Sequence, residues 1–180
     1  MCHCKLPVIL SFLLPLLPIA LASPPPPAIA ELALLTAAAE AQGAVFLDGS
    51  PAARYIVRGD PFRWIVYQQG GGWCSSLLDC SVRANSTLGS SKSYNKTSTK
   101  VMLEQGYLSN DPTVNPLFFN WTRVYLPYGD GTSQLGDVSD PVVVTPGAPP
   151  IYFRGARVLL SLLRLFFCGE NVQTFDDVAR

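Results

Sequence analysis

The sequence predicts an α/β fold whose mixed sheet is parallel in its centre. Short runs of β-branched and aromatic residues alternate along the chain with helix-forming segments, which is the pattern of strands connected by helices. The strands are expected at Tyr55–Val57, Trp64–Gln68, Arg123–Tyr128 and Ile151–Phe153. The longest helix is expected at Arg154–Phe167, directly after the last of these strands.

Residues 1–22 have the organisation of a secretory signal peptide. Lys5 supplies a positive charge, Leu6–Ile19 is largely apolar, and Ala20-Leu21-Ala22 is a small-x-small cleavage site. A membrane anchor is the alternative, but the apolar run is short and contains three prolines, whereas a spanning helix needs about 20 apolar residues. The protein is therefore expected to be secreted, with no membrane association after the signal is removed.

Residues 23–43 are expected to lie outside the core. Pro24–Pro27 is a polyproline run, which forms a stiff and extended spacer. Ala28–Gln42 is rich in alanine and leucine and predicts an N-terminal helix that ends at Gly43.

The remaining connections have recognisable signals of their own. Residues 58–61 (Arg-Gly-Asp-Pro) are expected to form the turn between the first two strands. Thr97–Gln105 predicts a helix that stops at Gly106. Pro141–Pro150 contains four prolines and is expected to be a surface loop.

The helix Arg154–Phe167 carries leucine, valine and phenylalanine on all sides. Such a helix is expected to be buried all round. A membrane span is excluded by its length and by Arg164. Residues 168–180 are expected to form a polar, divergent tail.

The charge balance and the histidine count exclude several classes of function. Thirteen basic residues balance thirteen acidic ones without a basic patch, which argues against nucleic acid and anionic membranes as partners. The single histidine, His3, belongs to the signal peptide, together with Cys2 and Cys4. No metal site and no cofactor are therefore expected.

Three cysteines follow the signal peptide, an odd number for an oxidising compartment. Cys74 and Cys80 are close in sequence and form the natural disulfide pair. Cys168 has no obvious partner.

The segment Gly70-Gly71-Gly72-Trp73-Cys74 follows the strand Trp64–Gln68 directly. Consecutive glycines allow tight folding that turns several N–H groups toward one point. Esterases of the α/β-hydrolase type use such a loop for half of the oxyanion hole. The alternative is a plain connecting loop, because three glycines alone are a weak motif.

Several further motifs accompany the glycine loop in a fixed order, and together they resemble the plant pectin acetylesterase family, whose animal relative is the secreted Wnt deacylase Notum. The resemblance extends from about Phe46 to about Leu165, and the form of the glycine loop favours the pectin branch. It implies an α/β-hydrolase-like domain, incomplete here, at residues 44–167. The motifs are Leu47-Asp48-Gly49-Ser50-Pro51, Leu88-Gly89-Ser90-Ser91-Lys92, Gly106-Tyr107-Leu108-Ser109, Asn115-Pro116, Asn120-Trp121, Tyr128-Gly129-Asp130-Gly131 and Tyr152-Phe153-Arg154-Gly155-Ala156-Arg157.

By this resemblance, the protein is a secreted esterase that hydrolyses acetyl esters on cell-wall pectin by a Ser-His-Asp mechanism. Gly71 and Gly72 would offer the oxyanion N–H groups, and Trp73 would line the substrate pocket. The family's nucleophile, a serine between glycine-cysteine and alanine-glycine-glycine, does not occur in this sequence. The chain is therefore expected to be an incomplete form, monomeric if folded and inactive alone.

Two other functions remain open. A non-catalytic secreted scaffold or carbohydrate-binding protein is favoured by the missing serine and histidine. A Notum-like carboxylesterase is disfavoured, because its acyl pocket would be lined largely by residues beyond this chain. For a member of the pectin branch, the expected partner is acetylated pectin or another cell-wall polysaccharide.

The sequence departs from the family at positions that bear on the site. Phe46 and Gly129 stand where the family has two cysteines. If those cysteines bond to each other in the family, the loss of both leaves no free thiol. Gln68 and Gln69 stand where the family has leucine and glutamate, which removes a charge beside the loop. Three glycosylation sequons are present: Asn85 and Asn95 are expected to be accessible, and Asn120 to be buried among aromatic residues.

Overall fold

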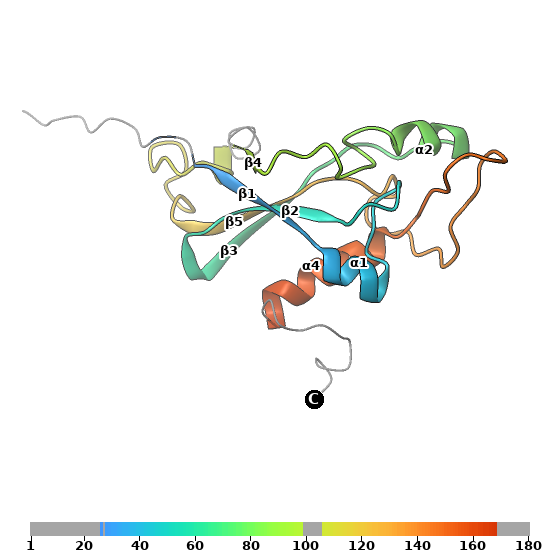
Figure 1. Ribbon diagram of the computed structural model, residues 1–180. Coiled ribbons are helices and arrows are strands. Elements are labelled where there is room, and N and C mark those ends of the chain that lie inside the picture. The colour runs from blue at the N-terminus through green and yellow to red at the C-terminus, as the bar shows by residue number, and fades with distance from the viewer. Residues whose placement is uncertain (1–25, 27, 99–105, 169–180) are drawn as a thin grey trace, which may run out of the picture.

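The computed structural model describes residue 26 and residues 28–98 and 106–168. Within these ranges a mixed sheet forms the centre, and the helices α1 and α4 lie together beside one of its faces (Figure 1). The strands are β1 (Ala30–Leu34), β2 (Ala53–Val57), β3 (Asp60–Gln68), β4 (Thr97–Ser98) and β5 (Trp121–Leu126). The helices are α1 (Thr36–Gln42), α2 (Leu77–Arg83), the short 3₁₀ helix η1 (Gly106–Leu108) and α4 (Gly155–Cys168).

The strand order is β3-β5-β2-β1-β4. The sheet is mixed as predicted, but the prediction of a parallel centre is wrong for the described residues, because the central strand β2 is antiparallel to its neighbours and the parallel pair lies at the edge. β3 and β5 run parallel, whereas β2 is antiparallel to both of its neighbours, β1 and β5. The chain therefore leaves β2, skips one position to form β3 at the edge, and returns as β5 between them. This crossover brings the carboxyl ends of β3 and β5 to the same edge of the sheet.

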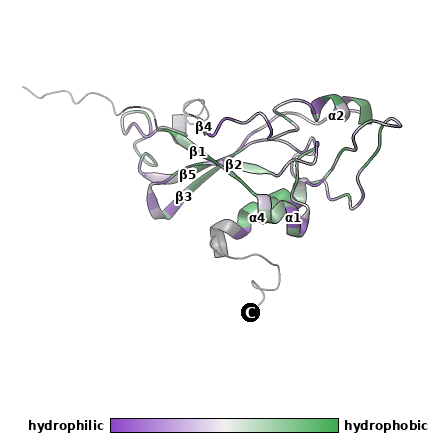
Figure 2. Cartoon of the chain, in the orientation of Figure 1, coloured by the Kyte–Doolittle hydropathy of each residue, from purple (hydrophilic) through white to green (hydrophobic). Residues whose placement is uncertain are grey.

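Each face of the sheet has its own apolar cluster. On one face Ile56, Val124 and Leu126 pack with Val158 and Leu162 of α4. On the other face the tyrosines of three adjacent strands stand side by side, with 5.2 Å between the ring centroids of Tyr67 and Tyr125. β1, β2 and much of α4 are accordingly coloured hydrophobic in Figure 2, while the segment between α2 and β4 is largely hydrophilic.

The predicted helix at Ala28–Gln42 is half wrong. Its first part is the strand β1, which pairs with β2 through Leu32 and Tyr55, and only Thr36–Gln42 is helical. Ala30 is fully buried against the tyrosine face. Pairing and burial in the sheet therefore stabilise this short apolar segment more than helix formation would, because helix propensity is a weak preference. Gly43 ends α1 in the left-handed conformation, at φ 67°.

Three further local predictions need correction. Thr97–Ser98 is a strand paired with Ala30 and Glu31, the rest of the predicted helix lies outside the described residues, and Gly106 begins η1. Ile151–Phe153 forms only an isolated bridge from Ile151 to Val142 and does not join the sheet. The turn after β2 is shorter than expected, because β3 already begins at Asp60.

α4 confirms the predicted helix, but its burial differs from the expectation. Val158 and Leu162 are buried, whereas Leu160 and Leu163 are 44% and 38% exposed. In the described residues only one side of the helix meets the sheet, so its other side stays open. The side chains of residues 165–168 lie outside the described part of the chain.

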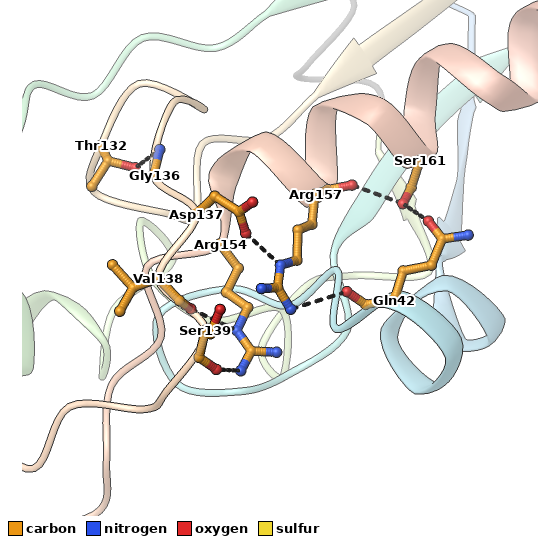
Figure 3. A network of polar contacts seen from close by, with 9 residues as sticks. All are labelled: Gln42, Thr132, Gly136, Asp137, Val138, Ser139, Arg154, Arg157 and Ser161. Atoms are coloured by element: carbon orange, nitrogen blue, oxygen red, sulfur yellow. Dashed lines mark hydrogen bonds and ion pairs between the residues drawn. The ribbon is translucent and has the colours of Figure 1, made fainter. Parts of the chain in front are cut away.

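Polar contacts fix the beginning of α4 to two other segments (Figure 3). The Arg157 guanidinium pairs with Asp137 at 2.5 Å and reaches the carbonyl of Gln42, the last residue of α1. Arg154 donates to the carbonyls of residues 138 and 139, and the Ser161 hydroxyl donates to the Gln42 side chain. The helix, the end of α1 and the loop at 137–139 are thereby held as one unit.

None of the helices within the described ranges combines the length and the apolarity needed to cross a bilayer.

Candidate functional site

The glycine loop begins where β3 ends, at the carboxyl edge of the sheet. The backbone N–H of Gln69 donates to the carbonyl of Leu126 at 2.9 Å, which continues the parallel pairing with β5. The Gln69 side-chain oxygen accepts the N–H of Tyr128 at 3.0 Å. A neutral amide therefore anchors the start of the loop.

The far side of the loop is fixed to α2 by a disulfide. Cys74 and Cys80 are bonded, with 5.1 Å between their Cα atoms, which confirms the predicted pair. Cys80 is buried in α2, and the hydroxyl of Ser76 caps this helix by accepting the N–H of Asp79. The N–H of Cys74 donates to the carbonyl of Gly131, so the loop after β5 is attached as well.

Arg83, the last residue of α2, holds the glycine loop through two of its carbonyl groups. Its Nη1 donates to the oxygens of Gly71 and Gly72 at 2.9 and 3.0 Å. The peptide bonds are trans, so each N–H points opposite to the carbonyl of the same peptide plane. The N–H groups of Gly72 and Trp73 therefore face away from Arg83, and neither makes a hydrogen bond to a described residue.

The three glycines differ in what surrounds them. A Cβ on Gly71 would overlap the ring of the buried Tyr128, so only glycine allows the loop to pass this close. Gly72 has open space at the same position but a φ of 69°, in the left-handed region that favours glycine. Gly70 has neither constraint.

The loop after β5 is organised around a buried carboxylate. Asp130 is 1% exposed, and its Oδ2 accepts the N–H groups of Thr132 and Gln134 and the Thr132 hydroxyl. Its Oδ1 has no partner among the described residues. Ser133 and Gln134 adopt positive φ values of 53° and 61°, which are uncommon for residues with a side chain.

The two loops meet at Trp73. Its indole N–H donates to the hydroxyl of Ser133, and the N–H of Ser133 donates to the Tyr128 hydroxyl at 3.0 Å. Trp73 remains 69% exposed. A pocket of about 270 Å³ lies between the loops, lined by Gln68, Gln69, Gly70, Gly71, Gly72, Trp73, Tyr128, Ser133 and Gln134. The residues predicted for the site thus lie together.

Sequence reasoning did not single out four of the residues that build this site. Ser133 and Gln134 could not be found, because positive φ at a residue with a side chain leaves no sequence signal. In the sequence Asp130 is only one residue of the motif at 128–131, and its role as a buried acceptor for the loop N–H groups depends on the fold. Arg83 lies twelve residues from the glycine whose carbonyl it binds.

Two larger pockets lie elsewhere, on either side of Asp48 and Lys92. Here the Lys92 ammonium pairs with Asp48 at 2.9 Å, and Asp48 also accepts the N–H and hydroxyl of Ser50. Ser91 donates its N–H to the Ser50 hydroxyl and its own hydroxyl to the carbonyl of Pro51. These contacts give the motifs at 47–51 and 88–92 a structural role, because they hold the two segments together.

Comparison with known proteins identifies the family. The profile described as Pectinacetylesterase matches residues 27–173. The chain belongs to the pectinacetylesterase family. It is 41% identical over 123 residues to pectin acetylesterase 7 of Arabidopsis thaliana, an alignment that covers 67% of this chain and 29% of the relative. The chain thus spans about three tenths of the length of this curated relative.

Animal relatives match a shorter region. The palmitoleoyl-protein carboxylesterase NOTUM of Homo sapiens is 35% identical over 85 residues, which cover 45% of this chain and 16% of the relative. The inactive palmitoleoyl-protein carboxylesterase notum1b of Danio rerio is 39% identical over 85 residues, which cover 45% of this chain and 58% of the relative.

Positions 46 and 129 of this pectinacetylesterase chain, where the resemblance predicts cysteines, are neighbours in the structure. The Phe46 ring lies against the Cα of Gly129, so closely that a Cβ there would overlap it. The N–H of Leu47 also donates to the carbonyl of Gly129 at 2.9 Å. The two positions are neighbours, and a large ring beside a glycine fills the space between them.

The asparagines of the three sequons are all exposed, whereas Thr122 of the third sequon is buried. This agrees with the expectation for Asn85 and Asn95. It corrects the expectation for Asn120, which follows the aromatic pair 118–119 at the surface and is not enclosed by it.

Proposed function

We propose that this chain forms the N-terminal part of a secreted pectin acetylesterase-type carbohydrate esterase, which hydrolyses acetyl esters on cell-wall pectin. One observation carries the proposal: a glycine loop stands at the carboxyl end of a parallel strand, where active-site loops of α/β sheets gather, and two of its N–H groups make no hydrogen bond to a described residue. Family membership and the names of the plant relatives support it. Residues 1–22 would be the signal peptide, 23–43 the N-terminal extension, 44–167 the partial esterase domain and 168–180 a divergent tail.

The sheet topology supports an α/β-hydrolase domain. In the described residues β3 pairs on one side only, with β5, and the apolar side chains of Trp64 and Val66 remain 37% and 41% exposed. They stand on the same face as Val124, the face that α4 covers further along. A following strand placed beside β3 would pair with its second edge and carry the nucleophile toward the glycine loop, and the segment that connects the two strands would cover Trp64 and Val66.

Within that domain the glycine loop would stabilise the oxyanion of the tetrahedral intermediate. Gly71 and Gly72 are the residues that the resemblance assigns. The carbonyl contacts of Arg83 favour the N–H groups of Gly72 and Trp73 as donors, with Gly71 giving room for the Tyr128 ring. Donors that are fixed before the reaction stabilise developing charge best, and the disulfide and Arg83 both fix this loop.

A chimeric enzyme tests the proposal. Residues 44–167 of this chain would replace the matching segment of pectin acetylesterase 7, and acetate release from acetylated pectin would be measured. We expect activity, and we expect Arg83→Ala, which releases the carbonyls of Gly71 and Gly72 and with them the orientation of the N–H groups of Gly72 and Trp73, to lower kcat by up to the roughly 100- to 1,000-fold that loss of one oxyanion donor costs. Gly70→Ala, at a position with open space, is the matched control. A folded chimera without activity would refute the proposal.

The sequence contains no serine between glycine-cysteine and alanine-glycine-glycine and no histidine other than His3, so we expect the chain alone to show no turnover of p-nitrophenyl acetate or acetylated pectin above background. Robust turnover that is lost on adding bulk at Gly71 would contradict this expectation. A serine such as Ser90, Ser91, Ser75 or Ser76 would then be the nucleophile.

A second function is a non-catalytic secreted scaffold that binds cell-wall carbohydrate. The similarity to notum1b, a relative named as inactive, favours it. The accessible Asn85 and Asn95 are suitable for glycosylation in either case, and we expect a monomer. Mass spectrometry of the secreted chain would test both modifications and the cleavage after Ala22.

A further inference from the structure

Among the described residues, those that line the pocket beside the glycine loop include no charged side chain. Its side chains are the amides of Gln68, Gln69 and Gln134, the hydroxyls of Ser133 and Tyr128, and the indole of Trp73. Amides and hydroxyls both donate and accept hydrogen bonds. Such a lining suits the hydroxyl and ester groups of a sugar but offers no counter-charge to a carboxylate.

The charges nearest to the pocket do not compensate for this. The Arg83 guanidinium contributes its Nη1 to the carbonyls of Gly71 and Gly72 on the opposite side of the loop. The buried Asp130 underlies Thr132 and Gln134, and its Oδ1 has no partner among the described residues. A carboxylate in the pocket would therefore lose hydration without gaining a cation, which is unfavourable.

Trp73 gives the pocket an aromatic wall. Its ring is 69% exposed, yet its N–H is fixed by the Ser133 hydroxyl. An exposed ring that is held in place offers a large apolar surface at little entropic cost. The C–H face of a pyranose ring can lie on such a surface, while the ring's polar groups contact the neighbouring amides.

We propose that this pocket binds an uncharged, esterified uronosyl unit in preference to a free uronate. The inference rests on the proposed function and deepens it: the enzyme would act where the carboxyl groups of the polymer are already esterified. The chemistry that fits is a sugar ring with its hydroxyls and a neutral ester in place of the carboxylate.

Calorimetric titration of the full chain tests the inference. The probes are oligogalacturonides of six units, either fully methyl-esterified or fully de-esterified, at one ionic strength. We expect the esterified probe to bind at least about tenfold more tightly, a difference near 1.4 kcal/mol. Equal or tighter binding of the free acid, or no binding of either probe, would overturn the inference.

Three variants locate the site. Trp73→Ala is expected to weaken binding of the esterified probe about tenfold or more, and Gln68→Lys, at an exposed position, to reverse the preference toward the free acid. Phe62→Ala, at the opposite end of β3 and 92% exposed, is the control that should leave both titrations unchanged. Equal effects of Phe62→Ala and Trp73→Ala would contradict the site. An active chimera that fails these titrations would refute this inference alone.

Discussion

Gly129 and Phe46 make a close contact between a ring and the backbone, at two positions where the resemblance predicts cysteines. Phe46 is 1% exposed, and its ring occupies the volume that a side chain at position 129 would need. The packing is therefore specific to a glycine, although the φ of Gly129 does not require one.

We predict that Gly129→Ala lowers the free energy of unfolding by about 1–3 kcal/mol, because the added methyl group overpacks a filled core. Gly70→Ala is the matched control, since nothing lies near its Cβ position, and it should change stability by less than about 0.5 kcal/mol. Denaturant titration of both variants measures the difference. Equal midpoints would show that the Phe46 ring can move aside.

Asp48 makes the stability of this chain depend on acid pH. Burial raises the pKa of the Asp48 carboxyl. Hydrogen bonds from Ser50 and the Lys92 ammonium lower that pKa by a larger amount, so the net pKa is below the ordinary value. A lowered pKa in the folded state stabilises the protein above the unfolded-state pKa of about 4, and this contribution is lost as the pH falls through the folded-state pKa.

We accordingly predict that Asp48→Asn is less stable than the wild type at pH 7, and that this gap narrows as the pH falls below about 4. Thermal unfolding at a series of pH values measures the gap. Asp140→Asn, at an exposed carboxyl, should give a curve parallel to that of the wild type. A gap for Asp48→Asn that stays constant with pH would contradict the assignment.

At the scale of elements, α4 has a buried side and an open side. Leu162 is 1% exposed and packs on the sheet, whereas Leu160 and Leu163 face outward in the described structure. Exposed apolar residues on one helix face promote association, so the open side explains why the isolated chain is expected to be poorly soluble.

We predict that the double variant Leu160→Gln/Leu163→Gln raises solubility and reduces binding of a hydrophobic dye, with little loss of stability. Leu162→Gln, the buried neighbour, should instead cost about 3 kcal/mol or more, because it buries an amide and loses core packing. Sedimentation and dye fluorescence measure the first effect, and denaturant titration the second. Similar behaviour of the two variants would show that the open side is covered in solution.

At the scale of the whole molecule, Phe46 and Gly129 join segments that are far apart in sequence. The first precedes β2 and the second follows β5, and a backbone hydrogen bond from Leu47 to Gly129 connects them. Their adjacency gives a physical basis to the expectation that cysteines at these two positions would bond to each other.

We predict that Phe46→Cys/Gly129→Cys forms a disulfide between residues 46 and 129 without loss of the Cys74–Cys80 bond. Closing a loop of about 80 residues stabilises the chain by roughly 4 kcal/mol, which offsets the packing lost with the ring. Peptide mapping identifies the bond. Adding reductant should lower the midpoint of denaturant unfolding of the double variant more than that of the wild type. Free thiols at both new positions would refute the predicted proximity.

The sequence by itself determined β2, β3, β5, α4 and the position of the glycine loop. Each of these is encoded locally, by alternating or continuous apolar residues, by strong breakers, or by a short cysteine spacing. The disulfide beside the loop follows for the same reason, because six residues of chain already hold the two thiols near each other.

Only the tertiary structure decided the rest. β1 is a strand because burial against Tyr55 outweighs a small helix propensity, and Ile151 stays outside the sheet because its pairing partner is Val142. The clamp of Arg83 on the glycine carbonyls and the positive φ of Ser133 and Gln134 likewise depend on segments brought together by folding. Contacts between residues that are distant in sequence stabilise these conformations by more than the local propensities oppose them. No local sequence pattern predicts such contacts.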